Sequence, residues 1–153
     1  MVYVLNIEGK PLMPCKEAKA RKLLKENKAK IYKKEPFTIQ LLFICENQTQ
    51  DITLGVDAGS KHIGLSATTK EKELYAADVE LRNDIVDLLS TRRQNRRTRR
   101  NRLRYRKPRF NNRVHSKKNG WLAPSVEQKI QTHFKVVEDI HKLLPITKIV
   151  VET

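Results

Sequence analysis

An uninterrupted cationic segment in the middle of the chain constrains its fold more than any other feature. Between Arg92 and Arg109 the sequence RRQNRRTRRNRLRYRKPR holds ten arginines, one lysine and no acidic residue. At about 100° per residue, a helix of this composition carries charge on every side and offers no apolar face to a core. Such a helix either projects into solvent or lies inside a charged surrounding. We therefore expect a helix that leaves the domain, is surrounded by the phosphate groups of a partner and ends at Pro108.

The positive charge of the chain is concentrated in this region. The net charge is +15; residues 82–118 hold fifteen basic and two acidic residues, whereas the rest of the chain holds 17 basic and 15 acidic ones. A localised cationic stripe predicts a polyanionic partner, most simply nucleic acid. Arginine, which dominates the run, suits bidentate phosphate contacts and stacking on bases. The residues that we expect to bind nucleic acid are Arg92, Arg93, Arg96, Arg97, Arg99, Arg100, Arg102, Arg104, Arg106 and Arg109.

A disordered basic tail or a targeting patch is the alternative explanation of this run. The position of the run in mid-chain, together with Leu89, Leu103 and Tyr105, favours a placed helix. The chain has only two cysteines, Cys15 and Cys45, which indicates a reducing compartment without a disulfide framework or a zinc site. The sequence has no apolar run long enough to span a bilayer and no secretory signal, so we expect a cytoplasmic protein without a membrane partner.

Residue patterning predicts a compact N-terminal unit followed by a β meander. In the N-terminal unit we expect a strand at 2–7, a rigid break at 11–14, a helix at 16–27 and strands at 29–32 and 37–45. Strands at 52–56, 63–67 and 74–79 then form an antiparallel meander. In the first of these, Ile52, Leu54 and Val56 share one face, while Thr53, Gly55 and Asp57 share the other. Helical spacing at Leu81, Ile85, Leu88 and Leu89 leads into the arginine run.

The last third of the chain predicts an amphipathic helix and a final strand. Ser125 is expected to cap the helix, with Gln128 completing a capping box. An apolar face then continues until Pro145 stops the helix; it comprises Val126, Ile130, Phe134, Val137, Ile140 and Leu144. The continuous apolar run from Ile149 to Val151 is typical of a strand buried on both faces. The four histidines show no ligand spacing and are taken as structural.

Two acids end apolar strands and could carry chemistry. Asp57 stands at the exit of its strand, before the small-residue turn AGSK, and Glu152 ends the last strand. If the last strand lies parallel beside the Asp57 strand, both carboxylates reach the same edge of the sheet and can hold a divalent cation. The alternatives are that Asp57 only makes a turn hydrogen bond and that Glu152 belongs to a solvated terminus.

Five stretches of the chain together resemble one known family. They are PLMP, PFTIQLL, LGVDAGSKHIGLS, the arginine run and IVVET, in this order. They resemble the IscB family, which are RNA-guided DNA nucleases of bacterial and archaeal transposons, and the arginine region resembles the RRXRR domain. The resemblance implies an α/β fold: a partial ribonuclease H-like (RuvC-type) mixed sheet with a long arginine-rich helix and a small N-terminal α+β unit.

The resemblance also implies a layout and a set of partners. The implied units are a PLMP-like unit at 1–50, the first RuvC piece at 51–81, an arginine-rich bridge helix at 82–110, and a loop, helix and strand at 111–153 that begin the second RuvC piece. The bridge helix is expected to lie against guide-type RNA and its hybrid with a DNA target. Asp57 and Glu152 are the implied catalytic acids and metal ligands, for Mg²⁺ or Mn²⁺ once the site is completed.

The chain departs from the family pattern after Glu152. Family nucleases continue with an HNH domain in most members, a third RuvC piece and target-recognition regions. We therefore expect an incomplete site, no cleavage by this chain alone, and a C-terminal nuclease part in trans as a candidate partner. Asp78 and Glu80 close the third strand, and nothing in the sequence directs them to the site. The alternative function is a stand-alone RNA-binding protein without nuclease activity.

Overall fold

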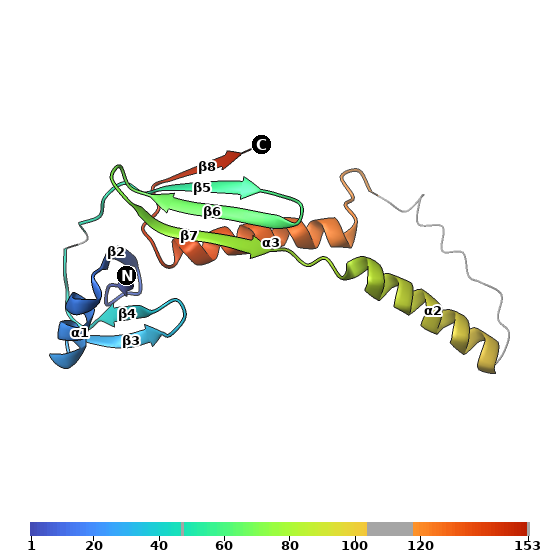
Figure 1. Ribbon diagram of the computed structural model, residues 1–153, viewed down its shortest axis with the longest axis horizontal. Coiled ribbons are helices and arrows are strands. Elements are labelled where there is room, and N and C mark those ends of the chain that lie inside the picture. Colours follow the sequence, from blue (N-terminus) through green and yellow to red (C-terminus); the bar gives the residue numbers. More distant parts are fainter. Residues whose placement is uncertain (47, 104–117, 153) are drawn as a thin grey trace.

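The computed structural model describes residues 1–46, 48–103 and 118–152. These residues form a mixed α/β structure with two four-stranded sheets and three helices (Figure 1). The expected α/β class with mixed sheets is thus confirmed. No helix in these ranges is long and apolar enough to cross a bilayer.

The first sheet belongs to the N-terminal unit. Its strands lie in the order β2-β1-β4-β3, with β1 parallel to β4 and the other pairs antiparallel. The elements are β1 (Val2–Leu5), β2 (Pro11–Cys15), α1 (Glu17–Lys25), β3 (Ala29–Lys33) and β4 (Thr38–Leu41). The expected rigid break at 11–14 is therefore wrong, because this segment is an edge strand. Pro11 is its first residue and Pro14 lies where the register with β1 shifts, and both positions tolerate a missing N–H.

The second sheet contains the predicted meander. Its order is β7-β6-β5-β8, with β5 (Thr53–Ala58), β6 (His62–Thr68), β7 (Glu73–Glu80) and β8 (Lys148–Glu152). The predicted alternation in the first strand is confirmed, since Ile52, Leu54 and Val56 are buried whereas Asp57 is exposed on the opposite face. The sheet thus has one face in the core and one open face.

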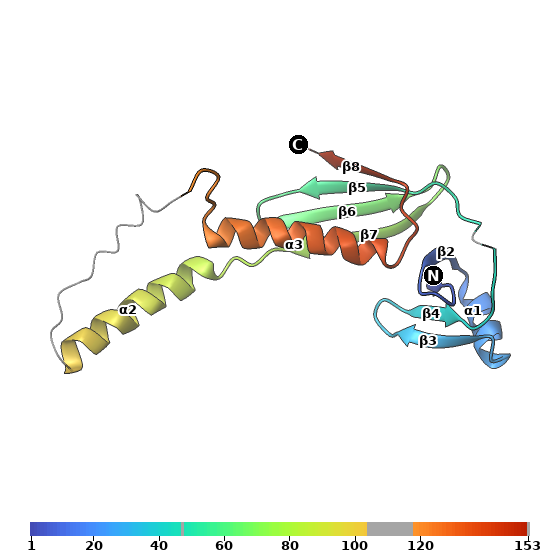
Figure 2. The same ribbon diagram turned by 180° about the vertical axis from the view of Figure 1, so that it is seen from behind.

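Helix α3 (Pro124–His141) covers the core face of this sheet, as both views show (Figures 1 and 2). Ile140 and Leu144 are fully buried against Ile52, Leu54 and Ile63. The predicted apolar face is only half correct, because Val126, Ile130 and Phe134 are exposed. The turn of the helix brings His133 and Val136, rather than Phe134, to the side on which Ile140 packs.

The predicted capping box at the start of α3 is wrong. The N-cap is Ala123, it makes no side-chain cap bond, and Pro124 occupies the first turn. Proline suits the first helical position because its missing N–H has no partner there anyway. Ser125 therefore lies inside the first turn instead of before it.

Strand β8 differs most from its expectation. The sequence predicts burial on both faces, but Ile149, Val150 and Val151 are 43%, 47% and 52% exposed. The reason is its place at the edge of the sheet, where only β5 pairs with it among the described residues. The predicted parallel pairing of β8 with β5 is itself confirmed.

Helix α2 (Ile85–Leu103) leads away from both sheets (Figures 1 and 2). It begins at Ile85 rather than near Leu81, because the Leu81 N–H donates to the Lys61 carbonyl oxygen at 2.7 Å and its side chain is buried in the core. The apolar stripe expected at Leu88 and Leu89 is exposed. The helix therefore leaves the domain as expected. The part of the predicted bridge helix beyond Leu103 lies outside the described residues.

Candidate functional site

Asp57 and Glu152 lie side by side at the ends of two parallel strands. They are register partners of β5 and β8, and both side chains are exposed. Neighbouring strands are about 4.8 Å apart, so the two carboxylates reach the same small region above the open face. The structure thus brings together the two acids that the sequence singled out.

A hydrogen-bond clamp between Ile52 and Thr147 fixes this pairing. The Ile52 N–H donates to Thr147 Oγ1 at 3.1 Å, and the Thr147 hydroxyl lies 3.1 Å from the Ile52 carbonyl oxygen. The backbone N–H groups of Thr147 and Lys148 also donate to that oxygen, at 3.0 and 3.2 Å. The clamp fixes the register of the two parallel strands. Asp57 lies five residues after Ile52 and Glu152 lies five residues after Thr147, so the two acids become register partners.

A glycine makes room for the Asp57 side chain on the neighbouring strand. Gly64 of β6 is the register partner of Asp57. A Cβ atom at Gly64 would lie 3.3 Å from Asp57 Cβ and 3.7 Å from Asp57 Oδ2, so the aspartate leans over the glycine. The missing side chain keeps the surface beside the carboxylate open.

A third acid lies in the same row across the sheet. Gly64 is also the register partner of Asp78 in β7. Residues directly opposite each other on neighbouring strands share a face, so Asp78, Gly64, Asp57 and Glu152 form one row on the open face. The expectation that nothing directs Asp78 to the site is therefore wrong, because the register of β7 brings it into the row. Counting the register through the two tight hairpin turns could have found it.

The acids of this row have different surroundings. Asp78 Oδ2 lies 3.4 Å from His62 Nδ1, on the same face. Within the described residues, no hydrogen bond or ion pair occupies the carboxylates of Asp57 and Glu152, so the alternative of a turn hydrogen bond to Asp57 finds no support. Although three acids share this row, no three His, Cys, Asp or Glu side chains of the described ranges are grouped so that they could hold one metal ion. Asp57 and Glu152 therefore offer a two-carboxylate site.

Small side chains surround the acids and form an open hollow. Gly55, Gly64, Ser66 and Ala76 line it together with the three acids of the row. Because these side chains are short, the hollow can admit a bulky group such as a phosphodiester backbone. The opposite face is closed by α3, so access is from one side of the sheet.

The turn that comes after Asp57 is held from behind by α3. Lys129 Nζ donates to the Ser60 carbonyl oxygen at 2.8 Å, and His133 Nε2 lies 3.3 Å from the Gly59 carbonyl oxygen. A Cβ atom at Gly59 would lie only 2.5 Å from the His62 carbonyl oxygen, so this turn requires glycine. His133 accordingly has the structural role that the sequence predicted.

The arginines of α2 form a second candidate surface. All side chains from Val86 to Arg102 are exposed. Among the described residues no carboxylate forms an ion pair with an arginine of this stretch. The described members of the predicted set are Arg92, Arg93, Arg96, Arg97, Arg99, Arg100 and Arg102; Arg104, Arg106 and Arg109 lie outside the described residues. The helix thus presents uncompensated positive charge on all sides.

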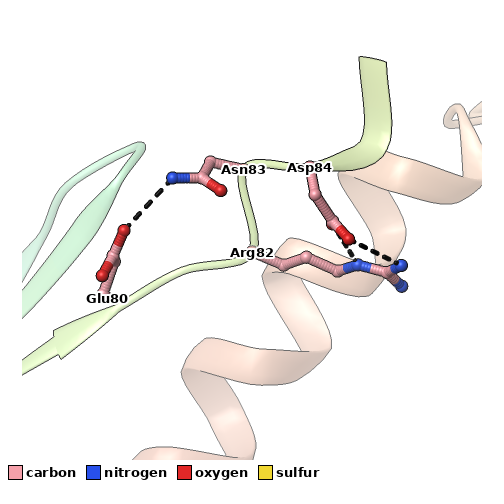
Figure 3. A network of polar contacts seen from close by, with 4 residues as sticks. All are labelled: Glu80, Arg82, Asn83 and Asp84. Carbon is pink, nitrogen blue, oxygen red and sulfur yellow. Dashed lines mark hydrogen bonds and ion pairs between the residues drawn. The ribbon is translucent and has the colours of Figure 1, made fainter. Parts of the chain in front are cut away.

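Two polar contacts fix the junction between β7 and α2 (Figure 3). Arg82 donates to both carboxylate oxygens of Asp84, and Asn83 Nδ2 donates to Glu80 Oε1 at 3.1 Å. The hydrogen bond from Arg82 lowers the pKa of Asp84, and the same bond raises the pKa of Arg82. The Asp84 carbonyl oxygen accepts the N–H of Leu88 at 3.0 Å as the first hydrogen bond of the helix.

The chain matches the model of a known protein family. The family model described as RRXRR protein matches residues 2–153 of the chain. No curated protein matches.

Proposed function

Because the chain belongs to the RRXRR protein family, we propose that it is the N-terminal part of an IscB-like, RNA-guided DNA endonuclease and binds guide-type RNA through α2. One observation carries the proposal: α2 is exposed on every side and has no acidic partner among the described residues. A helix with this much uncompensated charge is best stabilised by phosphates on several sides. Arginine can also stack on bases that are splayed out of an RNA helix.

The second sheet is the proposed nuclease part. A three-stranded antiparallel meander with a parallel fourth strand beside its first strand is compatible with the start of a ribonuclease H-like (RuvC-type) domain. Asp57 and Glu152 are the proposed catalytic acids. Their exposed oxygen atoms suit Mg²⁺ or Mn²⁺, since such ions are often held by one or two carboxylates, with water and phosphate completing the shell. The bound ion would activate a water and stabilise charge on the phosphodiester of a DNA target.

The residues of this chain have distinct tasks in the proposed site. Asp57 and Glu152 hold the cation through carboxylate oxygens, and the Thr147–Ile52 clamp keeps the two strands in step. Gly64 leaves the approach to Asp57 open. With two acids as its own ligands, the site needs further ligands for full activity, and we propose that a C-terminal nuclease part supplies them.

The alternative function is that of a stand-alone RNA-binding protein. The absence of a three-ligand group among the described residues favours it. In that case α2 carries the whole function and the acidic row has no catalytic role.

The deciding experiment measures RNA and metal binding separately on the full chain. Fluorescence anisotropy with a structured RNA should give tight, salt-sensitive binding that Asp57→Asn leaves unchanged. Calorimetric titration with Mn²⁺ should give a site that Asp57→Asn removes. A wild type that binds RNA but has no Mn²⁺ site would support the stand-alone function. A wild type that binds neither RNA nor Mn²⁺ would contradict the proposal as a whole.

A further inference from the structure

A hollow lies at the junction between the N-terminal unit and the second sheet. Its cavity volume is about 460 Å³, within the range of about 300–1,000 Å³ that is usual for ligand pockets. Its walls come from β3 and the turn that leads into β4, from β7, and from the last turns of α3, which point toward the N-terminal unit (Figures 1 and 2). Pockets between structural units are common ligand sites.

The two units are packed together beside this hollow, so its walls are held in place. Tyr3 of β1 is buried in the same core cluster as Leu54 of β5 and Ile140 of α3. The Tyr3 hydroxyl also donates to the Leu74 carbonyl oxygen of β7, at 3.5 Å. Met13 of β2 packs against the same cluster. The hollow is thus part of the folded structure and needs no rearrangement to form.

Two tyrosines, one from each unit, line the hollow. Tyr32 of β3 is 61% exposed, which leaves much of its ring to a ligand. Tyr75 of β7 is half-buried and lies on the core face of its strand, since its register partner is the buried Ala67. Tyrosine rings are surfaces on which a nucleobase of any kind can stack. The aromatic lining therefore favours a base over an aliphatic ligand.

Lysines from both units give the rim of the hollow a positive charge. Lys33 lines it from the N-terminal unit, Lys142 lines it just after α3, and both are exposed. Lys142 Nζ donates to Asp139 Oδ1 at 2.8 Å. This hydrogen bond is the main cause of the lowered pKa of Asp139, and the charges of Lys142, Lys135 and Lys33 lower it further. One carboxylate thus lies among three ammonium groups, so the excess charge suits a phosphate.

Asp139 offers a contact that a ribose can use. Lys142 occupies its Oδ1, whereas no described residue forms a hydrogen bond or ion pair with its Oδ2. A carboxylate oxygen can accept a hydrogen bond from a hydroxyl group. The 2′-hydroxyl is the group by which a protein distinguishes RNA from DNA. The hollow therefore combines groups suited to a base, a phosphate and a ribose.

We propose that this hollow binds one unstacked nucleotide of a single-stranded RNA segment. The base stacks on Tyr32, and the 2′-hydroxyl donates to Asp139. The flanking phosphates contact Lys33 and Lys142. Because these side chains are exposed, the strand can enter and leave the hollow on the solvent side. The site goes beyond the proposed function, since it involves neither α2 nor the acidic row, and its failure would leave RNA binding by α2 untouched.

The test uses a full chain in which α2 contributes less to binding. Four of its arginines are changed to glutamine in this parent, namely Arg96, Arg97, Arg99 and Arg100. Fluorescence anisotropy measures the affinity for a labelled short single-stranded RNA. Tyr32→Ala should weaken binding about tenfold, because stacking on the ring is lost. Tyr32→Phe keeps the ring and should bind like the parent. Lys33→Gln should weaken binding and make its salt dependence shallower by roughly 0.7, the slope of one phosphate contact with a single strand.

Matched controls carry the same kinds of change outside the hollow. Phe134 is also 61% exposed and does not line the hollow, so Phe134→Ala removes a comparable ring. Lys30→Gln removes a charge from an exposed position of the same strand as Lys33. Both should bind like the parent, and circular dichroism should confirm that every variant is folded. A parent that does not bind the RNA would overturn the proposal, as would equal losses in Tyr32→Ala and Phe134→Ala.

The choice of probe tests the identity of the ligand. Single-stranded DNA of the same sequence should bind the parent several-fold more weakly than RNA, because it lacks the hydroxyl group that donates to Asp139. Equal binding of both strands would overturn the assignment to RNA. Adenosine monophosphate should compete poorly with the strand. If it displaces the strand at a concentration similar to that of the unlabelled RNA, the hollow is a site for a free nucleotide and the proposal is wrong.

Discussion

Thr147 and Ile52, which are 95 residues apart in the chain, hold each other through hydrogen bonds of side chain and backbone. Their contact sets the register in which Asp57 meets Glu152. The position of the acidic pair therefore depends on a hydroxyl group at the other end of the two strands.

Replacing Thr147 by valine should destabilise the protein by about 1 kcal/mol, because the Ile52 N–H loses its side-chain acceptor. Urea unfolding measures this change. Thr147→Ser retains the hydroxyl group and should retain most of the stability. A loss of stability in Thr147→Ser but not in Thr147→Val would show that the methyl group, rather than the hydrogen bonds, holds β8.

Replacing Gly64 by alanine should weaken Mn²⁺ binding at the proposed site. The added Cβ atom would lie 3.3 Å from Asp57 Cβ, which is closer than an ordinary contact, so the aspartate must shift. Gly55→Ala is the matched control on the same face, since its Cβ atom would meet only the Ser66 carbonyl oxygen at 3.7 Å. We expect a several-fold rise in the Mn²⁺ dissociation constant for Gly64→Ala alone, measured by calorimetry. If Gly55→Ala raises the Mn²⁺ dissociation constant as much as Gly64→Ala does, the weaker binding does not come from a shift of Asp57.

Neutralising four arginines of α2 should reduce affinity for structured RNA and its dependence on salt. The plot of log K against log salt should become shallower by about 3, since each lost phosphate contact changes the slope by roughly 0.7 to 0.9. Fluorescence anisotropy at several salt concentrations measures this. The substituted residues, each changed to glutamine, are Arg96, Arg97, Arg99 and Arg100.

A matched control removes the same charge from α1 and its flank. Lys16, Lys19, Lys22 and Lys25 are exposed and are changed to glutamine together. This variant should keep most of the RNA affinity. If it loses as much affinity as the arginine variant, binding depends on net charge and not on the placement of α2.

The Asp84 carboxylate should titrate below the ordinary range of aspartate, because the hydrogen bond from Arg82 lowers its pKa. A carboxyl group whose pKa is lowered in the folded state contributes stability above its unfolded pKa, and this contribution is lost as the pH falls through the folded pKa. Carbon-detected NMR titration of Asp84 measures the shift. Arg82→Gln should return the pKa toward its ordinary value, and an unchanged titration would show that the pair does not persist in solution.

The sequence predicted those parts of the fold in which the local pattern decides. Alternation around Leu54 identified both the core face of β5 and the open position of Asp57, and the helix before the last strand indicated the parallel crossover. The exposure of β8 could not be predicted in this way, because the same aliphatic run can occur in a central strand or in an edge strand. What covers a strand is a property of the assembled sheet.

Strand register and helix rotation explain two other differences between the sequence-based predictions and the structure. Asp78 reaches the acidic row only through two successive strand pairings, so its place depends on both hairpin turns and not on its own neighbours in sequence. Similarly, the apolar face of α3 is broader than the part that packs, and the rotation of the helix leaves Phe134 outside the core. In both cases a local pattern allowed several arrangements, and tertiary contacts selected one.

The order of elements along the chain has a consequence for synthesis on the ribosome. The meander with Asp57 emerges first, α2 second, and β8 with Glu152 last. Domains form from the N-terminus during translation, and β8, the strand that places Glu152 beside Asp57, is synthesised only after the arginine helix. A nascent chain thus exposes its cationic helix before its two acids can meet, so any RNA bound by α2 can be captured before the proposed metal site is assembled.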